Sequence, residues 1–297
     1  MKKLLLIFNP AAGRGKIKGK LYEIINSFVK QGFKVTVFPT QNKGDATTIV
    51  MREEEDYDLL VCGGGDGTLN EVISGQMLSK KSIPIGYIPA GSMNDVAHSL
   101  KISREVKIAV KNILTGAPKN LDIGKFNDKY FIYVAAFGAF TDVSYTTSQK
   151  NKNTIGVLSY YLESIKKISD LKGRHVRVQY DNKVIEDDFI VGFVTNSLYI
   201  AGFKNVNYDK TSLNDGMFEI LLIKMPKNVI DLQAIISSLI NVKINENYMY
   251  YIQASNLTIT SDSMEWSLDG EFGGLYNKVE IENCSNAIEI ICHSRHK

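Results

Sequence analysis

The segment LLVCGGGDGTLNEVISGQML, residues 59–78, is the most informative part of this chain. Residues 59–62 form a short apolar run typical of a buried strand, and residues 68–78 carry apolar side chains at helical spacing. The glycines between them let the backbone turn sharply and direct successive N–H groups at an anion. A helix that starts near Thr68 adds the positive end of its dipole. We therefore expect a phosphate-binding loop over residues 62–68; the alternative is a glycine-rich connection that only allows tight packing.

Strand and helix alternate on both sides of this segment. Strands are predicted at residues 4–8, 34–38 and 83–88, and helices at residues 17–29 and 103–116. This order predicts a mostly parallel sheet covered by helices. Residues 1–121 are therefore interpreted as an α/β lobe.

From residue 122 onward the pattern changes to short β-rich runs. Turn dipeptides separate several of them, namely Asn127-Asp128, Asp181-Asn182, Asp215-Gly216 and Asp269-Gly270. Strands are predicted at residues 130–137, 176–180, 189–195, 218–223, 257–260, 279–282 and 288–292, and helices at residues 155–168 and 229–242. This pattern predicts an antiparallel, sandwich-like or partly barrel-like second lobe over residues 122–297. Whether its last strand returns to the first lobe is left open, and a ligand at the junction of the lobes is expected.

Composition excludes several classes of protein. The 297 residues are 44% apolar and 23% charged, which is the balance of a folded globular chain of two domains. A net charge of +3 is too small to indicate a nucleic-acid partner. Three scattered cysteines fit a reducing compartment, and no apolar run reaches the roughly 18 residues of a membrane span. We expect a soluble, cytoplasmic protein that can still touch a membrane surface.

The glycine-rich loop matches none of the common nucleotide motifs. The chain has no GxxxxGK[ST] and no GxGxxG, and it lacks the protein-kinase signatures. The expected phosphate site is therefore of another kind.

Four short motifs together resemble those of the diacylglycerol kinase catalytic family, which includes bacterial diacylglycerol kinases and sphingosine and ceramide kinases. GGGDGTLNEV at residues 63–72 resembles the nucleotide-binding signature of that family, and NPAAG at residues 9–13 resembles its first motif. PAGSMND at residues 89–95 and DGE at residues 269–271 are similar to its third and last motifs. Individually some are weak, but together they are specific and span most of the chain.

This resemblance implies an ATP- and Mg²⁺-dependent kinase that phosphorylates a lipid hydroxyl, with diacylglycerol as the first candidate. The implied nucleotide contacts fall on Asn9, Pro10, Ala11, Ala12, Gly13, Thr40, Gly64, Gly65, Asp66, Gly67, Thr68, Asn70, Glu71, Ser92, Asn94 and Asp95. Arg14 follows the first motif directly and is expected to reach a phosphate. The alternative for residues 92–95 is simple helix capping. Relatives often carry Arg at the position of His98, so a charge contact there is weaker or pH-dependent.

The resemblance also implies catalytic and metal-binding residues. Glu271 is the candidate general base, Asp269 orients it or meets Mg²⁺, and Asp66 organises Mg²⁺ or waters around the nucleotide. An ordinary Asp-Gly hairpin is the alternative at residues 269–270. In bacterial relatives a similar turn binds a non-catalytic Mg²⁺, which here implies Asp215 with the carbonyls of Ser212 and Met217. A plain hairpin is again the alternative, and Asp122 matches a family residue that helps to order the Mg²⁺ and water network.

The sequence says less about which residues contact the lipid or a membrane. Residues 150–177 hold seven Lys or Arg against two acidic residues, with apolar residues at helical spacing. Such a helix can lie on an anionic bilayer, but an ordinary core-facing helix with a solvated basic side has the same pattern. The expected partners are a lipid substrate at a membrane surface and, as a possibility, a second copy of the chain in a homodimer; no nucleic acid is expected.

Three other functions remain open. NAD kinases share a GGDGT loop, but the TLNEV continuation, the NPAAG start and the late DGE favour lipid kinases. A sphingoid base or another lipid alcohol would need the same chemistry. A nucleotide-binding regulator without turnover is the third alternative, against which the intact Asp66, Asp269 and Glu271 argue.

Overall fold

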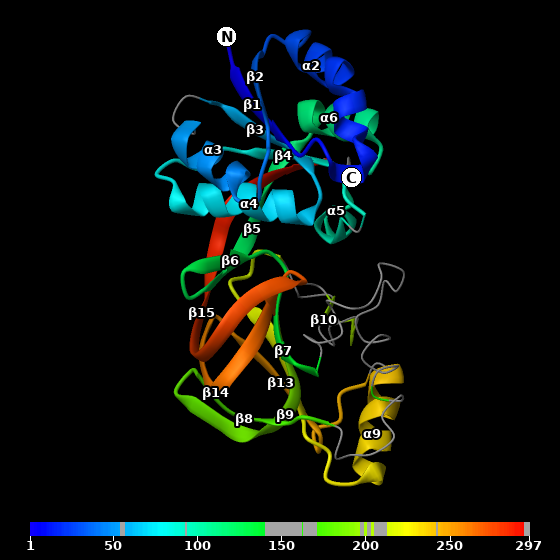
Figure 1. The fold of residues 1–297 in the computed structure, drawn as a ribbon, viewed down its shortest axis with the longest axis vertical. Helices are drawn as coiled ribbons and strands as arrows, with labels where there is room; N and C mark the ends of the chain where they lie inside the picture. The colour runs from blue at the N-terminus through cyan, green and yellow to red at the C-terminus, as the bar shows by residue number, and fades with distance from the viewer. Residues whose placement is uncertain are drawn as a thin grey trace. The chain divides into compact units, whose positions relative to one another are not determined.

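The computed structural model describes residues 1–53, 57–92, 94–139, 162, 171–196, 199–200, 203–204, 213–241 and 243–293. By its contacts the chain divides into two compact units, Met1–Leu121 with Asn286–Lys297, and Asp122–Ser285. Figure 1 shows the elements of each unit. No helix in the described ranges is both long and apolar enough to cross a membrane.

The first unit is built on a parallel sheet. Its strands lie in the order β2 (Lys34–Pro39), β1 (Lys3–Phe8), β3 (Leu59–Gly64) and β4 (Ile85–Pro89), and each neighbouring pair is parallel. Every residue of β3 and β4 is buried, as expected for strands covered on both faces. The end of β15 (Glu271–Cys292) adds a further parallel partner, with Ile290 opposite Ile85. The alternation of strand and helix predicted for this part of the chain is confirmed.

Helices cover the sheet of the first unit. They are α1 (Lys16–Gly19), α2 (Leu21–Val29), α3 (Asp45–Glu53), α4 (Asp66–Leu78), α5 (Asp95–Ser99) and α6 (Val106–Thr115), with a 3₁₀ turn η1 (Ala12–Arg14) before α1. α2 packs against α6, and α3 packs against α4 (Figure 1). One core joins Leu4, Leu6 and Phe8 of β1 with Ile24 and Phe28 of α2.

The second unit is dominated by antiparallel strands. They are β6 (Lys129–Phe131), β7 (Val134–Gly138), β8 (Arg174–Tyr180), β9 (Lys183–Thr195), β12 (Phe218–Lys224), β13 (Met249–Ala254), β14 (Asn256–Leu268) and most of β15, together with the end of β5 (Ala117–Phe126). A short pair, β10 (Tyr199–Ile200) and β11 (Phe203–Lys204), stands apart from this sheet. α9 (Val229–Ile240) begins where the Asn228 side chain accepts a hydrogen bond from Asp231 N.

Two long strands, β9 and β14, organise the sheet of the second unit. β9 pairs with β8 through its first half and with β7 and β12 through its second half. β14 likewise pairs with β8 through its first half and with β7 through its second half, so β8 and β7 lie one after the other between β9 and β14. The antiparallel, β-rich character predicted for this part of the chain is confirmed, and its sandwich-like form stays a prediction.

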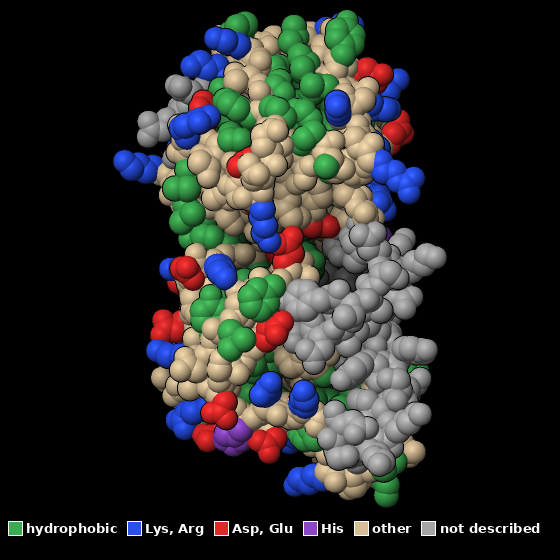
Figure 2. Space-filling view, in the orientation of Figure 1, with side chains coloured by type: hydrophobic (Ala, Val, Ile, Leu, Met, Phe, Trp, Pro, Cys, Tyr) green, Lys and Arg blue, Asp and Glu red, His purple; other side chains and the backbone are tan. Residues whose placement is uncertain are grey.

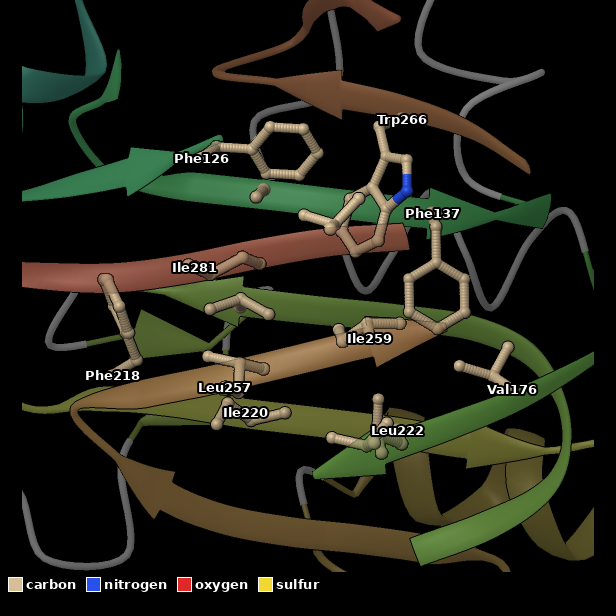
Figure 3. Close-up of a cluster of buried hydrophobic side chains, with 14 of the residues drawn as sticks. Phe126, Phe137, Val176, Phe218, Ile220, Leu222, Leu257, Ile259, Trp266 and Ile281 are labelled. Carbon is tan, nitrogen blue, oxygen red and sulfur yellow. The ribbon is translucent and has the colours of Figure 1, made fainter. Parts of the chain in front are cut away.

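Aromatic side chains fill a core of the second unit. Phe126 and Phe137 lie edge-on to Trp266 at ring-centre distances of 5.0 Å and 5.1 Å (Figure 3). Phe131 stacks on Phe218 at 5.6 Å. These rings come from β5, β6, β7, β12 and β14, so their packing joins strands that are distant in sequence.

Several predicted elements differ in their bounds. The strand predicted at residues 130–137 is two strands, because the N–H groups of Ile132 and Tyr133 bond the Asp269 carboxylate instead of a neighbouring strand. The strands predicted at residues 279–282 and 288–292 are parts of one continuous strand, β15. Apart from Leu162, the helix predicted at residues 155–168 lies outside the described residues.

Candidate functional site

Three segments of the first unit meet at one edge of its sheet, where β1, β3 and β4 have their carboxyl ends. Asn9 N donates to Gly63 O at 2.9 Å, and Ala90 N donates to Gly64 O at 2.7 Å, so the segments after these strands are joined in pairs. In parallel α/β sheets this is the edge at which ligands bind. The structure thus brings together the first three sequence motifs, which are separated by many residues in the chain.

Glycines make the close approach of these segments possible. Gly13 has φ 57, and a Cβ on it would collide with the carbonyl oxygen of Ala90. A Cβ on Gly91 would stand 2.5 Å from the Cα of Gly65, closer than real Cβ contacts come. The tight packing weighed as an alternative is therefore real. It also brings the backbone of the three segments to one place.

The glycine-rich segment leads directly into α4. The expected contacts Gly64, Gly65, Asp66, Gly67 and Thr68 lie in the turn and in the first turn of the helix. The N-cap residue is Gly65, which has no side chain to cap the helix, and the N–H groups of a first helical turn are the donors that an anion site uses. The half-buried Asp66 accepts a 3.4 Å hydrogen bond from Val96 N, which joins this turn to α5.

The first segment is held by a local turn. The Asn9 side chain accepts a hydrogen bond from Ala11 N at 2.9 Å, and Ala12 N donates to Asn9 O at 3.2 Å. The expected contacts Pro10, Ala11 and Ala12 lie in this turn. Arg14, the last residue of η1, is exposed with φ 58, and its contact with a phosphate stays a prediction.

Asn94 shapes the third segment from inside. It is 1% exposed and has φ 57; its Oδ1 accepts from Gly91 N at 2.8 Å and its Nδ2 donates to Gly91 O at 2.7 Å. Its amide therefore closes its own loop, and it caps α5 by position without a side-chain cap bond. Asp95 begins α5, and Met93 between Ser92 and Asn94 lies outside the described residues.

A basic residue that the sequence motifs did not indicate holds the same loop from outside. The exposed Arg104 donates from Nη2 to Ser92 O at 2.9 Å and to Gly91 O at 3.3 Å. Lys16 Nζ in turn donates to Arg104 O at 2.6 Å. His98, in the place of the usual Arg, is exposed at the end of α5. No motif could have signalled Arg104, because its contacts depend on where the chain before α6 returns.

The Glu71 side chain hydrogen-bonds the backbone at the start of a neighbouring helix. Its carboxylate accepts from Gly44 N at 2.8 Å and from Ala46 N at 3.3 Å, which caps the start of α3. This role makes Glu71 an organiser of the segment before α3. Thr40, buried at the end of β2, donates from its N–H to Phe8 O at 2.9 Å.

Two further polar groups in this region are defined by their surroundings. Asn70 Oδ1 lies 3.3 Å from the hydroxyl of Ser74, which donates to it. Burial raises the pKa of the Cys62 thiol far above its usual value, and the carboxylates of Glu71 and Asp66 raise it further. Cys62 therefore stays a neutral, unreactive thiol at the end of β3.

The Asp269-Gly270 pair of the second unit is a two-residue hairpin turn with φ 50 and 82, closing between Leu268 and Glu271. Its Asp269 carboxylate accepts hydrogen bonds from three backbone N–H groups, those of Ile132 (2.7 Å) and of the next two residues (both 3.0 Å). This carboxylate anchors the hairpin to the start of β7. The exposed Glu271 follows at the first position of β15.

Asp122 and the Asp215 turn lie together in the second unit. Asp122 is fully buried, and its carboxylate accepts a hydrogen bond from Gly216 N at 2.7 Å. The backbone N–H of Asp122 donates to Leu213 O at 2.9 Å. The exposed Asp215 accepts from Met217 N at 3.1 Å. Ser212 lies outside the described residues. Across the described ranges no three His, Cys, Asp or Glu side chains gather as a metal site, so an ion at this turn would need backbone oxygens as well.

Comparison with known proteins decides the family. Residues 3–126 match the sequence model of the diacylglycerol kinase catalytic domain. The chain is 32% identical over 278 residues to a diacylglycerol kinase of Bacillus subtilis (strain 168), covering 93% of this chain and 91% of the relative. The chain belongs to the diacylglycerol kinase family. A diacylglycerol kinase of Staphylococcus carnosus (strain TM300) is 36% identical over 279 residues, covering 92% and 90% of the two chains.

The fold agrees with this membership. A Bacillus anthracis str. Sterne crystal structure, described as a candidate diacylglycerol kinase, superposes with a TM-score of 0.80 at 26% identity, covering 98% of this chain and 97% of that one. As a member of the diacylglycerol kinase family the chain is a lipid kinase, and the family implies the use of ATP.

Proposed function

We propose that this chain transfers the γ-phosphate of Mg·ATP to the hydroxyl group of diacylglycerol, giving phosphatidic acid. The observation that carries the nucleotide part is the meeting of the segments after β1, β3 and β4, which places the N-terminus of α4 beside two glycine-dependent close approaches. The names of the relatives, all diacylglycerol kinases, support the lipid substrate.

The segments of the first unit bind the phosphate chain. Backbone N–H groups at the start of α4 carry partial positive charge, and Arg14 adds a full one nearby. Phosphoryl transfer demands positioning and neutralisation of charge more than covalent chemistry from the protein. Mg²⁺ fits the donor chemistry of Asp66, whose carboxylate is half-buried at the same turn; when bound, the ion neutralises charge on the phosphates.

Glu271 accepts the proton of the lipid hydroxyl in this proposal. A carboxylate is the ordinary base for this step, and Glu271 is exposed to incoming substrate. Asp269 supports Glu271 indirectly, because its three hydrogen bonds fix the hairpin that carries the base. Asp122 and Asp215 are proposed to hold a second, structural Mg²⁺ with carbonyl oxygens of the turn between them.

Contact with an anionic membrane surface is part of the proposal. It rests on the basic sequence of residues 150–177, most of which lie outside the described residues. On the face seen in Figure 2, the Lys and Arg side chains of the described residues are spread among acidic ones rather than gathered in one patch. Reversing the charges of Lys166, Lys167 and Lys172 should weaken binding to anionic vesicles, and unchanged binding would count against this contact.

The test is transfer of labelled γ-phosphate from Mg·ATP to diacylglycerol in mixed micelles that contain anionic lipid. Glu271→Gln should lower the rate by about 10²- to 10⁴-fold, the usual contribution of a general base. Glu280→Gln, an exposed carboxylate further along β15, is the matched control and should keep the wild-type rate. Full activity of Glu271→Gln would exclude it as the base.

Parallel acceptors test the substrate. A sphingoid base and NAD are offered in place of diacylglycerol under the same conditions. Formation of labelled NADP would mean that the acceptor is a nucleotide rather than a lipid. Preference for the sphingoid base would keep the chemistry and change the lipid.

A further inference from the structure

Tyr87 lies in the middle of β4 with its side chain fully buried. Its hydroxyl is 3.2 Å from Gly64 O and 3.3 Å from Asn94 Oδ1. The Asn94 amide is oriented independently, since its Oδ1 accepts from Gly91 N and its Nδ2 donates to Gly91 O. Gly64 O and Asn94 Oδ1 are both acceptors, so the Tyr87 hydroxyl is the donor in these two contacts.

The buried Tyr87 hydroxyl connects two segments of the nucleotide site. Gly64 ends β3 just before the turn into α4, whereas Asn94 closes the loop that follows β4. Above the hydroxyl, the same two segments come so close that a Cβ on Gly91 would stand 2.5 Å from the Cα of Gly65. Their separation is therefore set by a side-chain bond on the buried side and by glycine contact on the outer side.

We propose that Tyr87 is a positioning residue, whose hydroxyl fixes the spacing between the glycine-rich turn and the 91–94 loop and thereby the affinity of the site for a polyphosphate. This rests on the nucleotide site of the proposed function. The phosphate chain needs N–H groups at fixed distances, and a pair of loops held at one spacing loses no free energy in adjusting to it. Tyr87 touches no ligand in this proposal; it acts through Gly64 and Asn94.

Tyr87→Phe isolates the hydroxyl. The ring keeps its packing, and both acceptors keep another donor: Gly64 O has Ala90 N, and Asn94 Oδ1 has Gly91 N. Neither of these two acceptors is left without a donor, so the fold should survive with a small change in melting temperature. Loss of one net hydrogen bond corresponds to about fivefold in affinity.

Calorimetric titration of Mg·ATP, tripolyphosphate and adenosine separates positioning from a general structural defect. Tyr87→Phe should bind Mg·ATP and tripolyphosphate about fivefold more weakly, and adenosine within about twofold of wild type. Tyr248→Phe is the matched control, since it removes a tyrosine hydroxyl that bonds Asp231 at 3.2 Å in the second unit, and it should leave all the affinities unchanged.

The results of these titrations separate the role of Tyr87 from the proposed function. Unchanged affinity of Tyr87→Phe for both polyphosphates, or an equal loss for adenosine, would overturn the positioning role. A wild-type protein that binds none of the ligands would overturn this inference and the nucleotide site together. Binding that follows the expected pattern, with no transfer to any lipid, would sustain the inference and overturn only the proposed reaction.

Discussion

Replacing Gly91 by Ala tests whether the close approach of two loops creates the nucleotide site. The added Cβ would stand 2.5 Å from the Cα of Gly65 and 2.9 Å from the Oδ1 of Asn94. Neither neighbour is the far end of a flexible side chain, since one is backbone and the other is held by Gly91 itself. Gly91 does not have a positive φ, so the substitution adds a steric conflict without backbone strain.

The expected size follows from that conflict. Overpacking by one carbon in a tight site costs about 1–3 kcal/mol, which the loops must release by moving apart. If the movement is absorbed at the nucleotide site, affinity for Mg·ATP falls by about 5- to 150-fold. At Gly65 the Cβ would meet the Cα of Gly91 at 3.1 Å, which needs a shift of only a few tenths of an ångström, so Gly65→Ala should lose less.

Gly19→Ala is the matched control for both variants. A Cβ at Gly19, the last residue of α1 in the same unit, meets no atom within 4 Å. The assay is calorimetric titration of Mg·ATP, with the melting temperature measured in parallel. The expected order of affinity is Gly19→Ala equal to wild type, then Gly65→Ala, then Gly91→Ala. Wild-type affinity in Gly91→Ala would refute the idea that this approach shapes the site.

Three further outcomes are expected. Asp269→Ala removes the acceptor of three backbone N–H groups and should lower the free energy of unfolding of the second unit in urea by on the order of 3 kcal/mol, with Asp269→Asn losing less; equal stability of both variants would contradict the anchoring role. Arg104→Met should raise the KM for ATP by about two- to fivefold with little change in kcat, because its bonds to the Gly91 and Ser92 carbonyls are exposed, while Lys107→Met, three residues further along at the start of α6, should change neither. Hydrogen bonds to Asp188 and Glu186 raise the pKa of His175 in the folded protein. The stability that these bonds add should therefore be complete below the unfolded pKa of about 6.5 and be lost as the pH rises through the folded pKa. A melting-temperature difference between wild type and His175→Gln that does not shrink with rising pH would count against this role of His175.

The parts of the fold that sequence predicted are those set by local pattern. The run of residues 59–78 was expected to be strand, turn and helix, and it forms β3, the glycine turn and α4. The Asp-Asn and Asp-Gly pairs at residues 181–182 and 269–270 are two-residue hairpin turns, as their dipeptides predicted. Such signals depend on the backbone preferences of a few neighbouring residues.

The parts that sequence missed depend on contacts between distant residues. The carboxylate of Asp269 reaches N–H groups that precede it by more than 130 positions, and this contact divides one predicted strand into β6 and β7. Tyr87 looked like an ordinary strand residue until the structure placed its hydroxyl between Gly64 and Asn94. Periodicity records which face of a strand is buried, but it does not record what a buried hydroxyl meets.

The two interpretations of the glycine-rich segment, tight packing and phosphate binding, are therefore one arrangement seen from two sides. Gly65 and Gly91 are glycines because their backbones nearly touch, and that approach is also what gathers N–H groups where a phosphate chain can use them. It follows that loss of activity in a glycine variant does not distinguish a damaged fold from a damaged site. Comparing a polyphosphate with adenosine on the same variant does, since a damaged fold weakens both ligands and a shifted pair of loops weakens only the one that carries phosphates.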